Sequence, residues 1–355
     1  MDAKITKNRL VQMLSYDWIK IAATALAVIF FWMLIFTWSA TRITNTQKFV
    51  IHNYFGVSLG DGYYTAGYNG FGKGKVFSYE VFETENVNLN QGEDVSYQLL
   101  EARYGVGEMD VILIADILNP TAYFDKDGNQ ISSSSITENT EYTQKSYLET
   151  FCKSAYLKGA TRLDDGENTD GFFTQMKKYL SQFYTVLSET EKTFGEIKLT
   201  VADFDESSLD TQTVKDLFKA RATANKDKRF KTDEEWQKGY ADEIARIQSY
   251  QKAYEEFFTY LEGGYISFTV WNYENPYTYF TSGGAYSLNL CPNEDLMGNL
   301  KKDFFYRLQD ENQKPYSTAK DMNIVFMELE GLDPDFKYEN LLLVNQIVRR
   351  HGANL

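Results

Sequence analysis

An aspartate is the first side chain in this sequence that we consider for chemistry. Asp116 directly follows the apolar run Val111 to Ala115, and ligands in open α/β sheets bind beyond the carboxyl ends of the strands. Asp116 is therefore a candidate ligand-binding residue. The alternative is an aspartate that caps a junction between a strand and a loop.

Five aromatic residues are further candidates for ligand contact. They are Tyr63, Tyr64, Trp271, Tyr273 and Tyr277. The two tyrosines at 63 and 64 lie in a glycine-rich stretch, residues 54–75, and the other three lie in an aromatic segment, residues 265–280. Aromatic rings on loops can stack against sugar rings or clamp a peptide. Packing in a hydrophobic core is the alternative for each of them.

Catalytic and metal-binding patterns are not evident in the sequence. The two histidines, His52 and His351, lie near opposite ends of the chain, so we expect neither to anchor a Ser-His-Asp or Cys-His arrangement. The cysteines lack the CxxC spacing of a zinc site. We predict no catalytic residue, no metal and no cofactor. A hydrolase that uses two of the 50 acidic residues is the remaining enzyme class.

Two short stretches are similar to ligand loops but lack their spacing. GYNGFGKGK, residues 67–75, fits neither GxxxxGK[ST] nor GxGxxG, so we expect a loop. DKDGNQI, residues 125–131, places Gln130 and Ile136 where a calcium loop requires Gly and Glu. Its Asp-Gly and Gly-Asn pairs instead predict a tight hairpin turn.

Cys152 and Cys291 are the only cysteines. An exported location would permit a disulfide between them, but their separation in the sequence gives no support for one. Cys152 falls on the apolar face of a predicted helix. We therefore favour two buried free thiols.

The stretch from Ile21 to Ala40 contains twenty residues without a charge, between Lys20 and Arg42. A helix of that length is about 30 Å long and matches the hydrocarbon core of a bilayer. Residues 1–20 carry four basic and two acidic side chains, which favours a cytoplasmic N-terminus. A cleaved secretory signal that ends at Ala40 is the alternative, and the length of the apolar run favours an uncleaved anchor.

The remainder of the chain is acidic. After the first twenty residues, 32 basic and 48 acidic side chains remain, for a net charge of −16. An acidic exterior repels nucleic acid and anionic lipid. We therefore predict no nucleic-acid partner.

Residues 76–116 predict a strand, a helix and a second strand. The last of these, Val111 to Ala115, is a short continuous apolar run, as expected of a strand that is buried on both faces. The segment YQLLEARYGVGEMDVILIAD, residues 97–116, resembles the first lobe of type II extracellular solute-binding proteins. In that family a helix, a glycine and an aspartate-led strand open the substrate cleft, and Gly107, Asp110 and Val111 match this pattern.

Helical patterns dominate the middle of the chain. The predicted helices cover residues 147–156, 172–187, 209–224 and 232–262. The last one starts at a capping box formed by Thr232 and Glu235 and stops at Gly263. Between the second and third helices, EIKLTVADF, residues 196–204, predicts a strand that returns to a sheet.

Two helices are predicted at the C-terminal end. Thr318 and Asp321 resemble a capping box, with Asp in place of Glu, ahead of a helix that Gly331 ends. Pro334 fits the first turn of the second helix, within DPDFKYENLLLVNQIVRRH, residues 333–351. This tail is also similar to the terminal helices that brace the first lobe of solute-binding proteins.

These features together predict an α/β protein. A single N-terminal transmembrane helix is followed by a two-lobed extracytoplasmic domain, similar to periplasmic binding proteins, with a helix-rich second lobe. The expected parts are a cytoplasmic tail (1–20), the span (21–40), a stalk (41–47), the first lobe (48–120), the second lobe (121–264) and a return to the first lobe with C-terminal helices (265–355).

The resemblance implies a bacterial protein that binds a small solute, a sugar or a peptide, and feeds it to a transporter permease. The apolar span would tether it to the membrane, which is a departure from the pattern of that family. The bilayer, reached through Ile21 to Ala40, is then a further partner. The alternative is a non-enzymatic scaffold of the cell envelope, in which a binding-protein fold serves contact with another envelope protein.

Overall fold

A computed structural model shows two compact units, Met1–Thr44 and Asn45–Leu355, and each is described by itself. The residues that the structure describes are 11, 15, 18–39, 47–54, 58–59, 76–89, 93–152, 159–167, 169–272, 283–302, 304–305, 317–327 and 338–355.

The first unit contains α2 (Trp18–Ser39), a helix of 22 residues. Within it, Trp18–Phe36 has a mean hydropathy of 2.3 and is not buried by the protein, so by length and composition the helix can cross a membrane. It begins three residues before the predicted span. The hydroxyl of Thr24 donates to the carbonyl of Lys20 over 2.8 Å, which satisfies this polar side chain within the helix.

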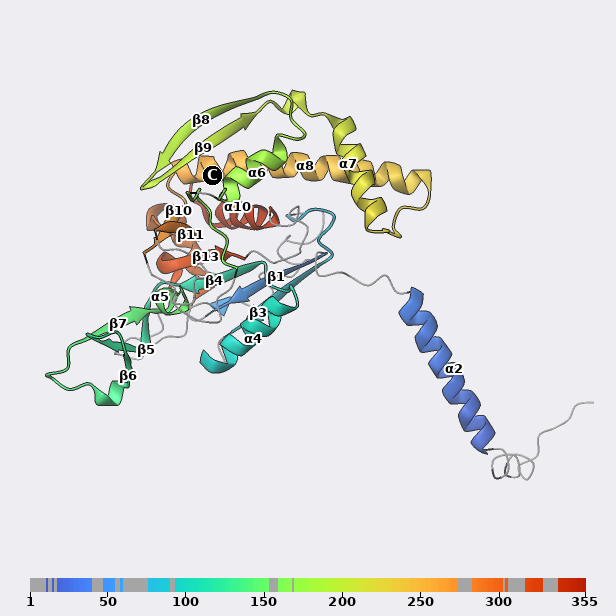
Figure 1. The fold of residues 1–355 in the computed structure, drawn as a ribbon, viewed down its shortest axis with the longest axis horizontal. Coiled ribbons are helices and arrows are strands. Elements are labelled where there is room, and N and C mark those ends of the chain that lie inside the picture. The colour runs from blue at the N-terminus through green and yellow to red at the C-terminus, as the bar shows by residue number, and fades with distance from the viewer. Residues whose placement is uncertain are drawn as a thin grey trace, which may run out of the picture. The chain divides into compact units, whose positions relative to one another are not determined.

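The second unit is built on a six-stranded mixed sheet with the order β10-β11-β13-β4-β1-β3 (Figure 1). Its strands are β1 (Lys48–Asn53), β3 (Glu83–Asn88), β4 (Val111–Ala115), β10 (Ser267–Trp271), β11 (Gly284–Asn289) and β13 (Met322–Phe326). β1 runs parallel to β3 and to β4, and β13 runs antiparallel to β4 and to β11. The predicted strand, helix and strand at 76–116 are confirmed, with β1 inserted between the two strands.

Helices cover both faces of this sheet (Figure 1). One hydrophobic cluster joins Leu113 to α6 (Phe172–Leu180), α8 (Asp233–Glu262) and α10 (Glu339–His351). A second cluster joins Ile112, which points to the opposite face, to α4 (Glu93–Gly105) and α5 (Tyr147–Cys152). Because both faces are covered, β4 and β13 are buried along their whole length, which explains the continuous apolar sequence of β4.

The long helix α8 begins as predicted. The Oγ1 of Thr232 accepts from the backbone N–H of Glu235 over 3.2 Å, and the Oε2 of Glu235 accepts from the N–H of Thr232 over 2.8 Å. The 30 residues of α8 give it a length of about 45 Å. It follows α7 (Thr211–Ala224), which is capped by the side chain of Asp210.

Three smaller sheets accompany the main sheet in the described residues. The shortest pairs β2 (Ser58–Leu59) with β12 (Phe304–Phe305). β8 (Leu187–Phe194) and β9 (Ile197–Phe204) form a hairpin. Earlier in the chain, β5 (Leu118–Asp125) pairs with β6 (Gln130–Ile131) and β7 (Tyr142–Ser146). The hairpin turn predicted at 125–131 is confirmed, and Gly128 there adopts a φ of 82°, which favours glycine. The other short elements are η2 (Ser133–Ser135), η3 (Glu206–Ser208), α9 (Glu294–Met297), η4 (Gly298–Lys302) and η5 (Ala319–Asp321).

The helix predicted from Thr318 is wrong. Residues 322–326 form β13, between β4 and β11, and the Thr318 side chain makes no cap hydrogen bond. The run MNIVF fits both a buried helix and a buried strand, and pairing on both sides selects the strand here. Pro334 and Asp333 lie outside the described residues, and the last helix, α10, starts at Glu339.

Two other boundaries and one strand pairing also differ from the predictions. The helix predicted at 172–187 ends at Leu180, and Leu187 begins β8. The strand predicted at 196–204 is present as β9, but it pairs with β8 in a separate hairpin and not with the main sheet. Of residues 76–89, only Glu83–Asn88 are a strand.

The described residues show a mixed α/β domain. Residues 45–355 form one compact unit. Phe173 on α6 and Tyr254 on α8, from the predicted second lobe, share a hydrophobic cluster with Leu113 of the sheet. The division into two lobes remains a prediction.

Candidate functional site

β1 lies at the point where the strand order of the sheet reverses. It is the first strand of the domain, and the next two strands of the main sheet, β3 and β4, pair with it on opposite sides and in the same direction. In open α/β sheets, ligands bind at such a point, beyond the carboxyl ends of the parallel strands. The residues at that edge are therefore the first place to look for a site.

Asn53, the last residue of β1, is fully buried at this edge. Its Nδ2 donates to the Oδ1 of Asn86 over 2.7 Å and to the Oδ1 of Asn88 over 2.9 Å, both on β3. The Oδ1 of Asn53 has no hydrogen-bond partner in the part of the chain that the structure describes. A buried acceptor without a donor costs about 1–3 kcal/mol.

Other buried side chains in the described ranges also have unpaired atoms, but at other places. They are both ring nitrogens of His52 and the Oδ1 atoms of Asn340 and Asn345. Asn340 and Asn345 belong to α10, and the Nδ2 of Asn345 donates to the carbonyl of Ala253 on α8 over 2.8 Å. Asn53 differs from these two asparagines because it ends a parallel strand at the switch point.

His52 on β1 is fully buried, although it lies near the apolar N-terminal stretch in the sequence. Burial lowers its pKa to about 4, with a smaller contribution from the charge of Arg103, so the ring is neutral at pH 7. Among the described residues, no group of three or more His, Cys, Asp or Glu side chains could hold a metal ion.

Asp116 lies at the same edge as Asn53. Asn53 pairs with Leu113 of β4, and Asp116 lies three residues after Leu113 in the chain. Asp116 is exposed, and its backbone N–H donates to the carbonyl of Asp321 over 2.8 Å. Burial raises the pKa of Asp321, and the charge of Asp116 adds to that effect. Two neighbouring acids make this edge favourable for a neutral or cationic ligand and unfavourable for an anion.

Trp271 lies at the other end of the sheet. It pairs with Gly284, the first residue of β11. Asn289, the last residue of β11, lies at the end of the sheet where Asp116 is found, because Asn289 pairs with Asn323 and Asn323 pairs with Ile114. The indole of Trp271 is fully buried, donates to the Oγ of Ser287 over 2.9 Å and lies 5.3 Å from the ring of Tyr286. The structure therefore does not bring Trp271 to Asp116.

The other four candidates, Tyr63, Tyr64, Tyr273 and Tyr277, lie outside the described residues. Asn53 was not among the candidates. Its signal in the sequence was the change from an apolar strand to His-Asn-Tyr, with two asparagines in alternate positions, Asn86 and Asn88, on the next strand.

Asp110, which carries part of the resemblance, acts at the amino end of β4. Its Oδ2 accepts from the backbone N–H of Val50 over 2.7 Å. It thereby joins β1 to β4 and stays away from the edge where Asn53 lies.

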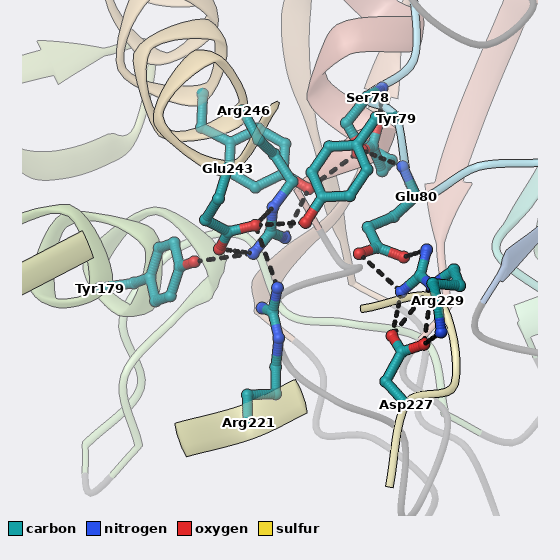
Figure 2. A network of polar contacts seen from close by, with 11 residues as sticks. Ser78, Tyr79, Glu80, Tyr179, Arg221, Asp227, Arg229, Glu243 and Arg246 are labelled. Carbon is teal, nitrogen blue, oxygen red and sulfur yellow. Dashed lines mark hydrogen bonds and ion pairs between the residues drawn. The ribbon is translucent and has the colours of Figure 1, made fainter. Parts of the chain in front are cut away.

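A second polar group lies among α8, α7, α6 and the segment before β3 (Figure 2). At its centre, Glu243 and Arg246 pair within α8, with 2.6 Å between Oε1 and Nη2. Arg221 of α7 lies 3.0 Å from the Oε2 of Glu243, and the hydroxyl of Tyr79 donates to the same oxygen over 2.7 Å. Burial alone would raise the pKa of Glu243, but these partners outweigh it and hold the pKa at about 2.

The carboxylate of Glu339 extends this group toward α10. It is fully buried and accepts from the hydroxyl of Tyr250 over 2.8 Å and from the N–H of Ser78 over 3.2 Å. Burial raises the pKa of Glu339 and the two donors partly offset this rise.

Arg229, in the loop between α7 and α8, forms the third part of the group (Figure 2). It contacts both carboxylate oxygens of Glu80 over 3.0 and 3.1 Å and pairs with Asp227 over 2.6 Å. Ser78 is thus bound to α10, Tyr79 to α8, and Glu80 to this loop. Because each carboxylate here has its donors, we interpret the group as a clamp that fixes the helical layer to the segment before β3.

No family model, no curated protein and no solved structure matches this chain.

Proposed function

We propose that this chain is a membrane-anchored protein that binds a small ligand at the carboxyl edge of β1, β3 and β4. The observation that carries the proposal is the Oδ1 of Asn53, which is buried at the switch point and has no donor among the described residues. A ligand hydroxyl or amino group in that position would supply the missing hydrogen bond.

The chemistry of this edge selects the ligand class. Asn86 and Asn88 offer amide groups, and Asp116 adds a negative charge. Amides and a carboxylate together recognise hydroxyl and amino donors, so we propose a neutral sugar or polyol, or the amino end of a short peptide. Delivery of the ligand to a membrane permease is the use that the resemblance implies.

The anchor and the second lobe belong to the same proposal. We propose that α2 crosses the membrane with the N-terminus in the cytoplasm, in line with the basic residues that precede it. β5 begins at Leu118, two residues after Asp116, so the β5–β7 sheet is the next element of the chain beyond the ligand edge. In a two-lobed arrangement it would form the opposite wall of the cleft.

Thermal unfolding with a ligand panel tests the proposal. Full-length protein in detergent is heated with neutral sugars, polyols, amino acids and short peptides, each at high concentration. A ligand at 100 times its Kd stabilises the folded state by about 2.7 kcal/mol, which gives a clear rise in Tm.

Asn53→Leu is the diagnostic variant. It removes the unpaired acceptor, which favours folding, and also the two hydrogen bonds that Nδ2 donates to Asn86 and Asn88, which opposes it. The Tm of the free protein should therefore change little, while the ligand-induced rise disappears. Asn340→Leu is the matched control, because Asn340 is also buried with an unpaired Oδ1 but belongs to α10. The proposal fails if no ligand raises Tm, or if the rise is the same in Asn53→Leu.

A further inference from the structure

β10 is the outermost strand of the main sheet, and among the described residues it pairs only with β11. Its sequence, SFTVW, contains no charge and no proline. Natural edge strands are usually protected by such residues against pairing with other chains. The register of β10 against β11 shifts between Thr269 and Val270, and such an irregularity is one of the features that protect an edge.

An open groove of about 1050 Å³ runs beside this edge. Phe268 and Val270 of β10 line one wall, and Phe194 and Ile197 of the β8–β9 hairpin line the other. Figure 1 shows the end of this hairpin next to β10. The rings of Phe194 and Phe268 lie 6.2 Å apart, so the two walls meet at an apolar contact.

The charges at the groove are acidic. Lys192 pairs with Glu262 over 2.5 Å, so the two cancel. The exposed carboxylate of Glu196, at the turn of the hairpin, is then the uncompensated charge among the residues that line the groove. A ligand with a basic residue near that end would be attracted to it.

We propose that this groove binds an extended segment of a partner protein, which adds to β10 as a further strand. The side of β10 opposite β11 pairs with no described strand, and it selects an extended conformation because it offers N–H and C=O groups at the spacing of a strand. The apolar walls select hydrophobic side chains at alternate positions, and Glu196 selects a Lys or Arg at one end. This site is separate from the ligand edge, and the proposal does not depend on ligand binding there.

A second copy of this chain is a less suitable occupant. Each copy would bring the same acidic turn at Glu196 and the same net charge of −14, so two copies repel each other. The partner that fits is a different protein with an apolar, basic segment.

Selection from a peptide library tests the proposal without knowledge of the partner. Random twelve-residue peptides are displayed and selected for binding to the full-length protein in nanodiscs of neutral lipid. Peptides that also bind the Val270→Lys variant are removed, because an inward lysine blocks pairing at the edge of a sheet. We expect enriched peptides with alternating apolar residues and a basic residue at one end. The most enriched peptide is then synthesised for binding and hydrogen-exchange measurements.

Three results support the proposal together. The synthetic peptide slows hydrogen exchange at the β10 amides. Methylation of the alternate peptide nitrogens that face β10 weakens binding about tenfold or more, whereas methylation of the intervening nitrogens does not. Glu196→Lys weakens binding about threefold or more, and because Glu196 lies at an exposed turn the substitution does not endanger folding. The control is Glu138→Lys, in the loop between β6 and β7, which is also exposed and leaves binding unchanged.

Other results would overturn it. One is a library in which no peptide is enriched on the protein relative to Val270→Lys. Another is an enriched peptide that leaves exchange at β10 unchanged. A third is a dimer of the full chain that Val270→Lys converts to a monomer, which would assign the groove to a second copy.

Discussion

Glu243 and Arg246 lie one turn apart on α8, and their side chains meet with 2.6 Å between Oε1 and Nη2 while almost fully excluded from solvent, at 4% and 0% exposure. Arg221 and Tyr79 supply further donors to the same carboxylate. A buried ion pair is stable only when its members keep their partners. The clamp in Figure 2 is therefore sensitive to the loss of a single charge.

Arg246→Met should destabilise the folded protein by about 3–5 kcal/mol, because it leaves the carboxylate of Glu243 buried with too little compensation. Urea unfolding of the full chain measures this change. Arg349→Met is the matched control, because Arg349 pairs with Glu256 of the same helix α8 at an exposed position, where the expected loss is below about 1 kcal/mol. Equal losses for the two variants would contradict the clamp.

The acid stability of the protein should depend on Glu243. Its pKa is about 2 in the folded state against 4.5 for the ordinary group, so the carboxylate stabilises the fold above pH 4.5 and this contribution disappears as the pH falls toward 2. The contribution is about 3 kcal/mol. The difference in unfolding free energy between the wild type and Glu243→Gln should therefore shrink between pH 5 and pH 3. A difference that stays constant over this range would disprove the assignment.

Gly239→Ala should destabilise the protein although alanine is the better helix former. A Cβ at Gly239, inside α8, would lie 2.7 Å from Phe230 and 3.0 Å from Phe218. The rings would have to move, at a cost of about 1–3 kcal/mol. Gly105→Ala is the control, since no atom lies within 4 Å of its Cβ position, and it should be neutral or stabilising by up to about 1 kcal/mol. Thermal unfolding compares the two, and a stable Gly239→Ala would contradict the close packing.

Cys152 and Cys291 are both buried and free, as favoured from the sequence. Burial raises the pKa of Cys291 to about 11, so its thiolate is scarce at neutral pH. We expect both thiols to resist a thiol reagent in the native protein, and two equivalents to react rapidly in denaturant without reductant. A single equivalent, or none, would indicate a bridge or another modification.

Features that depend on neighbouring residues were predictable from the sequence. The capping box of Thr232 and Glu235 works within one helical turn, and the turn at Gly128 depends on its own dipeptides, so neither needs the rest of the fold. β13 was misread because its neighbours β4 and β11 come from distant parts of the chain. The partner of β9 was not predictable either, because the alternation of apolar and polar residues in a strand does not reveal which strand it pairs with.

The candidate site was predictable only in part. Asp116 was selected because an apolar run ends beside it, and in the structure it follows β4 at the carboxyl edge of β1, β3 and β4. The role of Asn53 depends on β3 lying next to β1, which brings Asn86 and Asn88 to its amide. That pairing is a property of the sheet, and one residue of register shift would turn these side chains away.

The sheet order also determines when this protein can fold during its synthesis. Val111 of β4 pairs with Phe326 of β13, more than two hundred residues later in the chain. Strand pairs so distant in sequence form slowly, because a large loop must close first. Until β13 has been made, β4 lacks one neighbour and exposes an apolar edge. A nascent chain of this protein should therefore depend on a chaperone or holding factor for most of its translation.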